Sequence, residues 1–114
     1  MPTVSEIQEQ DILTRVREAA ARRILFLPHA VNQMNSPDRM ISTEEIRAVV
    51  FHGVLVENYR EDVRGHSCLM LGWGGGDRPL HVVCAPKADY LAIITTYLPS
   101  STQWEPDWQT RRKR

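Results

Sequence analysis

The first part of the chain repeats apolar residues with the period of an α-helix. They recur every four positions from Ile12 to Ala20, which predicts a helix over about residues 4–25 with one apolar stripe. Thr3 or Ser5 can cap this helix, because a side-chain oxygen at its start can accept a hydrogen bond from the first turn.

Two shorter helices are expected next. Pro28 suits the first turn of a helix, which predicts one over residues 29–35. A second is expected over residues 42–52, because Ser42 and the glutamate three residues later form a capping box. Gly53 follows as the left-handed residue that would stop this helix.

After Gly53 the pattern changes to that of β-strands. Apolar runs separated by short polar or glycine-rich links predict four strands, over residues 54–59, 66–73, 80–85 and 90–98. Such short links permit only antiparallel hairpins. The chain is therefore expected to be α+β, with N-terminal helices packed on one face of a four-stranded antiparallel meander sheet.

The hairpin register predicts which side chains share a face. A hairpin centred on Gly76, followed by a second one, brings His81 opposite Tyr97 and places Thr95 on the same face. We expect these three side chains to line an open groove, with a guanidinium from the helical half reaching over it.

Composition indicates a single globular domain. The 114 residues are 42% apolar and 25% charged, and no apolar run is long enough for a membrane span or a secretory leader. We expect one cytoplasmic domain over residues 1–114, with a helical part over 4–52, a sheet over 54–98 and a C-terminal extension over 99–114. Two cysteines are too few for a disulfide framework, and Cys68 and Cys84, opposite each other in the same hairpin, are expected to be free buried thiols.

The charges balance. Lys+Arg and Asp+Glu both number 14, so the protein has no bulk positive field to hold nucleic acid. The dense basic cluster is the tail from Arg111 to Arg114, which we expect to be solvated. Trp104 and Trp108 are expected to anchor the C-terminal extension across the domain.

A series of motifs points to a known family. In order, they are HAVNQM, DRMIS and EEI within residues 29–46, GVLVENY at 53–59, CLMLGW at 68–73, RPLHVV at 78–83 and IITTYLP at 93–99. Together they resemble the bacterial domain-of-unknown-function family 4258, over about residues 28–108. That family is grouped with RelE-like and BrnT-like toxins, small α+β proteins whose relatives cleave messenger RNA and are neutralised by an antitoxin. The resemblance implies a toxin of a toxin–antitoxin system and a metal-independent endoribonuclease.

By position, the resemblance marks His29, Arg39, His81, Thr95 and Tyr97. For RNA cleavage, His81 would act as base or acid, Tyr97 would donate a proton or stack on a base, and Arg39 would clamp the phosphate. His29, at a helix start, would bind phosphate or orient a neighbour.

Arg60, Arg78 and Thr95 are candidate substrate-binding residues, since arginine suits bidentate contacts with phosphate. Each of the candidate catalytic residues could instead have a purely structural role. His81 and Tyr97 can simply fill the sheet, and His29 and Arg39 can serve as a helix-start residue and an ion-pair partner.

No Cys/His spacing matches a zinc site, and we expect neither metal nor cofactor. The partners implied are an antitoxin protein and RNA or the ribosome, with no membrane. The long first helix also favours a homodimer. The alternative function is a non-catalytic protein-interaction module, and an enzyme acting on a small molecule is a third class.

Overall fold

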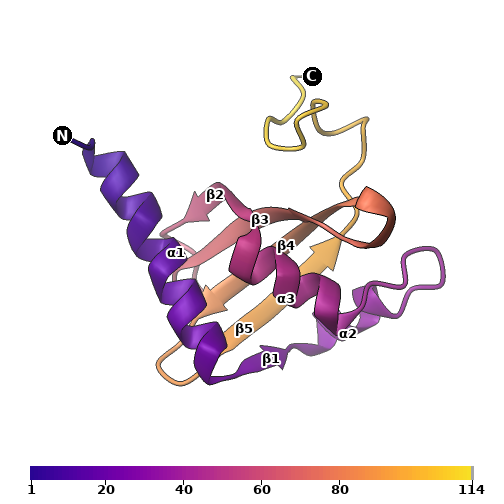
Figure 1. Ribbon diagram of the computed structural model, residues 1–114, viewed down its shortest axis with the longest axis horizontal. Helices are drawn as coiled ribbons and strands as arrows, with labels where there is room; N and C mark the ends of the chain where they lie inside the picture. Colours follow the sequence, from indigo (N-terminus) through magenta and orange to yellow (C-terminus); the bar gives the residue numbers. More distant parts are fainter. Residues whose placement is uncertain (114) are drawn as a thin grey trace.

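The computed structural model describes residues 1–113, with the side chains of Ser5, Gln8 and Glu9 left out. Figure 1 shows three helices and a sheet. In chain order the elements are α1 (Val4–Arg22), β1 (Ile24–Phe26), α2 (Pro28–Met34), α3 (Thr43–His52), β2 (Val54–Tyr59), β3 (Ser67–Trp73), the 3-10 turn η1 (Gly75–Asp77), β4 (Pro79–Pro86) and β5 (Leu91–Tyr97). None of the helices in this described part of the chain is both long and apolar enough to cross a membrane.

The sheet has five strands in the order β1-β5-β4-β3-β2. Strands β2 to β5 form the expected antiparallel meander, but β1 adds a parallel edge, with Ile24 opposite Leu91. The α+β class is confirmed, and the four-stranded antiparallel sheet is corrected to a five-stranded mixed one. Only Arg23 separates the three apolar residues of β1 from the helix, and so short a run has no period that distinguishes a strand from one more helical turn. The helix predicted to residue 25 therefore ends at Arg22.

The predicted cap and buried stripe of α1 are confirmed. Thr3 caps the helix, since its Oγ1 accepts a hydrogen bond from the Glu6 amide at 3.1 Å; the alternative cap, Ser5, lies outside the described side chains. The stripe that contains Ile12 and Val16 is buried. The N-terminal part of α1 projects past the sheet (Figure 1). A homodimer through this helix stays a prediction.

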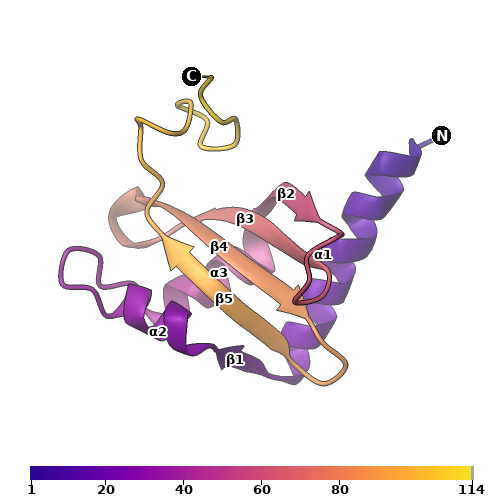
Figure 2. The same cartoon turned by 180° about the vertical axis from the view of Figure 1, so that it is seen from behind.

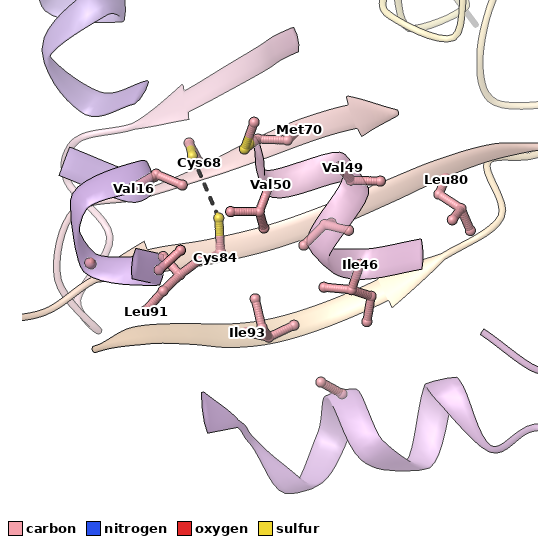
Figure 3. Packing of buried hydrophobic residues seen from close by; sticks show 14 of the residues in the cluster. Val16, Ile46, Val49, Val50, Cys68, Met70, Leu80, Cys84, Leu91 and Ile93 are labelled. Carbon is pink, nitrogen blue, oxygen red and sulfur yellow. Dashed lines mark hydrogen bonds between the residues drawn. The ribbon is translucent and has the colours of Figure 1, made fainter. Parts of the chain in front are cut away.

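One face of the sheet packs against α1 and α3 (Figure 3). Val49 and Val50 of α3 and Val16 of α1 lie over the side chains of the central strands. Cys68 and Cys84 sit opposite each other in this core as free thiols, with their sulfur atoms 4.0 Å apart, as expected.

The centre of the other face packs against two tryptophans of residues 99–113, which we call the C-terminal strap. The strap leaves the end of β5 and folds back on itself (Figure 2). Trp104 is 1% exposed and packs with Leu69 and Val83, and Trp108 packs against the same cluster. The two tryptophans therefore anchor the segment as predicted and bury the centre of this sheet face.

Gly53, between α3 and β2, is not left-handed as expected. Its φ of −78° and ψ of −177° are extended, so any residue could adopt this backbone. The constraint is space: a Cβ at this position would lie 2.4 Å from the Leu71 carbonyl oxygen and 2.5 Å from that of Val49. Both are backbone atoms, which cannot rotate away.

Gly53→Ala is expected to lower the free energy of unfolding by about 1–3 kcal/mol, the usual cost of overpacking. Gly75→Ala is the matched control, since a Cβ there meets nothing closer than 3.8 Å. Its effect should stay within about 0.5 kcal/mol. Urea unfolding of both variants measures the difference, and equal stabilities would contradict the close-approach explanation.

Glu45 joins the helical layer to the β3–β4 turn. Its carboxylate accepts hydrogen bonds from the Ser42 amide at 3.0 Å, the Gly75 amide at 2.8 Å and the Arg78 guanidinium at 2.9 and 3.1 Å. The reciprocal bond from the Glu45 amide to Ser42 completes the predicted capping box. Burial alone would raise the pKa of Glu45, but these bonds outweigh it and lower the pKa to about 2.

The depressed pKa makes Glu45 stabilising above the pKa of the unfolded chain, and the effect is lost as the pH falls towards 2. Glu45→Gln should therefore cost up to about 3 kcal/mol of unfolding free energy at pH 7. The gap between variant and wild type should narrow between pH 4.5 and pH 2. Urea unfolding across this range tests it, with the exposed Glu44→Gln as control; a gap independent of pH would refute the assignment.

Candidate functional site

His81 and Tyr97 meet on the strap-covered face of the sheet. They are cross-strand partners in β4 and β5, and Thr95 lies two residues along, opposite Val83. The predicted register is therefore confirmed. The His81 Nδ1 atom lies 3.2 Å from the Tyr97 hydroxyl, and Nε2 lies 2.8 Å from the Trp108 carbonyl oxygen. Because a carbonyl can only accept, Nε2 carries the proton and Nδ1 accepts from Tyr97.

The expected open groove over this pair is absent from the described structure. His81 is 0% exposed, and its ring packs edge-on against Trp104 with the centroids 4.6 Å apart. Tyr97 is half-buried beside it. The strap thus fills the space in which a substrate would contact the imidazole.

Burial also sets the charge of the pair. Loss of solvation lowers the pKa of His81 and outweighs the Trp108 carbonyl, which favours the protonated ring. Burial likewise raises the pKa of Tyr97. Both side chains are therefore neutral at pH 7, so the Tyr97 hydroxyl can donate a hydrogen bond to the unprotonated Nδ1 atom of His81.

The guanidinium nearest this face belongs to the strap. Arg111 forms a bidentate ion pair with Glu57 of β2 at 2.8 and 2.9 Å, and its guanidinium lies 4.6 Å from the Trp104 ring centroid. The bonds from Arg111 lower the pKa of Glu57, and Tyr59 also donates to this carboxylate. The pairing of Glu57 with Arg111 was not predicted from the sequence. The only signal was the pair of tryptophans, which implied that the strap crosses the sheet.

Arg78, expected to bind substrate, is engaged inside the protein. Its guanidinium donates to Glu45 and to the carbonyl oxygens of Arg39, at 2.6 Å, and Met40, at 3.0 Å. Through these hydrogen bonds, the Arg78 side chain connects the loop before α3 to the β3–β4 turn. A phosphate would have to displace these bonds.

The other predicted site residues do not converge on His81. His29 is exposed at the start of α2, Arg39 is half-buried in the loop before α3, and Arg60 is exposed after β2. Among the described residues, none of these three side chains forms a hydrogen bond with His81 or Tyr97. Of the predicted site residues the structure brings together His81, Thr95 and Tyr97, and the expected guanidinium from the helical half is replaced on this face by Arg111 of the strap, which contacts Trp104 and Glu57.

No curated protein and no solved structure was found to match the chain. One protein family does match, that of the domain of unknown function DUF4258, over residues 26–98. The match runs from the end of β1 to the residue after β5, so it contains His81 and Tyr97 and stops where the strap begins. Since it covers more than half of the sequence, the chain belongs to the DUF4258 family.

Proposed function

We propose that this protein is a non-catalytic protein-interaction module with a RelE/BrnT-like fold. The observation that carries the proposal is the state of His81, the acid–base candidate of the sheet. Its ring is fully buried, and both nitrogens are hydrogen-bonded within the protein. A general acid or base must reach the proton that it transfers, and this imidazole contacts only its own chain.

The charges around the pair support the same proposal. Cleavage of RNA without metal needs cations that steady the extra charge on the phosphate. Arg111 is paired with Glu57, and Arg112 lies 3.4 Å from Glu105. With a formal net charge of zero, the chain has little attraction for a polyanion.

The partner that the RelE/BrnT resemblance suggests is an antitoxin-like protein encoded beside this one. In such a pair, the present chain would supply a rigid α+β surface on which the partner orders. Co-expression of the two followed by size-exclusion chromatography with light scattering is expected to give a stable complex. Separate elution of the two chains at micromolar concentration would refute this choice of partner.

RNA cleavage is the second candidate, and the position of the family match favours it. His81 and Tyr97 lie inside residues 26–98, whereas the strap that covers them lies outside. With the strap withdrawn, His81 and Tyr97 would face solvent as a neutral base and a proton donor beside Thr95. The chain would then act as a metal-independent messenger-RNA endoribonuclease of a toxin–antitoxin system.

A cleavage assay separates the two candidates. The purified full-length chain, incubated with single-stranded RNA or ribosome-bound messenger RNA, is expected to leave both intact. True catalysis at this face would instead fall by at least about a hundredfold in Tyr97→Phe, because acid–base groups contribute about 10²–10⁴-fold. Tyr90→Phe, in the β4–β5 turn, is the matched control. Cleavage by wild type and Tyr90→Phe but not by Tyr97→Phe would overturn the interaction-module proposal.

A further inference from the structure

Resting on the proposed interaction function, we propose that a cleft at the end of β3 accepts an arginine side chain of the partner protein. The cleft has a volume of about 310 Å³. One wall comes from the end of α3 and the start of β2, and the other from the strap. Trp73 and Asp107 both line it.

Trp73 provides an aromatic platform. It is 54% exposed, although it ends a strand whose other residues are buried. The ladder between β2 and β3 begins with Val54 opposite Leu71, so Trp73 extends beyond the strand that would otherwise flank it. Among the described residues, the cation–π contacts involve Phe51 and Trp104, which leaves the Trp73 ring face for a ligand.

Asp107 provides a fixed negative charge. Its carboxylate accepts hydrogen bonds from the amides of Gln109 and Thr110, at 2.9 and 3.0 Å, and from the Thr110 hydroxyl at 2.9 Å. The bond from the Gln109 amide is the largest of the effects that hold the pKa of Asp107 below its usual value. The carboxylate is therefore ionised and held in one orientation, and its exposed lone pairs remain available to a donor.

The charge of the cleft selects a cation. Of the described residues that line it, Asp107 is the one aspartate, and no glutamate, lysine or arginine is among them; His52 and Gln109 are the remaining polar side chains. The other walls are apolar, with Ala48, Val54 and Leu71. A phosphate-bearing ligand would face an unpaired carboxylate, whereas a cation gains from both the carboxylate and the indole ring.

A guanidinium fits this combination better than an ammonium. It is planar, so it can stack on the Trp73 ring while it donates two hydrogen bonds to a carboxylate. The aliphatic part of the side chain would pack on the apolar walls. Tryptophan and arginine are also the residues that most often dominate the binding energy of protein interfaces. The cleft is thus the anchor point of the proposed interaction.

The probe for this site is N-acetyl-arginine amide, titrated into the full-length protein while the Trp73 indole N–H is followed by NMR. Saturable shifts at Trp73 are expected. Asp107→Asn keeps an oxygen that can accept from the Gln109 and Thr110 amides but removes the charge, and Trp73→Leu keeps apolar bulk but removes the ring. Each should weaken binding about threefold to fivefold, as expected for an exposed ion pair or cation–π contact.

Asp89→Asn, exposed in the β4–β5 turn, is the matched charge control and should bind like wild type. Equal binding of N-acetyl-norleucine amide would show an apolar site only, and tighter binding of adenosine monophosphate, unaffected by Asp107→Asn, would show a nucleobase site. Either result overturns the inference. If the partner complex forms but arginine amide does not bind, the arginine cleft is refuted while the proposed interaction function stands. RNA cleavage that depends on Tyr97 would overturn the interaction module without changing the result at Trp73.

Discussion

The hydrogen bond between the buried His81 ring and the Trp108 carbonyl ties the family domain to its C-terminal strap. A buried polar nitrogen without a partner costs free energy, so the seating of the strap and the burial of His81 depend on each other. Trp104 completes the arrangement by covering both the imidazole and the apolar side chains of the central strands. The side chains at the centre of the sheet are consequently buried on both faces. Any function of the protein has to use its periphery or first lift the strap.

Pairing of charges has a similar consequence for the rest of the surface. Arg78, Arg111 and Arg112 are each matched with a glutamate, so cations that look free in the sequence are already bound in the fold. In the tail that was expected to be solvated, Arg111 and Arg112 form ion pairs with Glu57 and Glu105. Arg114 lies outside the described residues. Asp107 contrasts with these pairs, because it lines a cleft to which no lysine or arginine of the described residues contributes. Although the net charge of the chain is zero, this cleft carries a local negative charge that favours a positively charged ligand.

Much of the fold could be predicted from the sequence because its signals are local. The capping box of Ser42 and Glu45 fixes the start of α3. The glycine turn sets the register of β3 with β4, and the turn at residues 87–90 sets the register that places His81 opposite Tyr97. The strand β1 could not be predicted, because its three residues form a strand only by pairing with β5. The paired residues Ile24 and Leu91 are 67 positions apart in the sequence. Gly53 was misjudged because its constraint is the Leu71 carbonyl of another strand.

The sequence predicted which residues of the sheet lie together at the candidate site, but it did not predict that other residues bury them. Alternation gives the face on which a side chain lies, yet it says nothing about what covers that face. The pairing of Glu57 with Arg111 spans 54 residues and leaves no periodic trace in either segment. Burial of His81 therefore depended on a contact that no local pattern encodes, although the two tryptophans of the strap pointed to its location.

The energy of the strap also constrains the two candidate functions. Withdrawing Trp104 would expose about 150–250 Å² of aromatic surface, which corresponds to up to about 4–6 kcal/mol. The open state would then be populated at about 10⁻³–10⁻⁴, and the apparent affinity for an RNA that needs it would fall by the same factor. A partner arginine in the cleft would contact both the strap, through Asp107, and the end of β3, through Trp73, so it would bind the seated strap and stabilise the closed state. Binding of a partner protein at the cleft would therefore oppose RNA cleavage at His81, because the two need opposite positions of the strap.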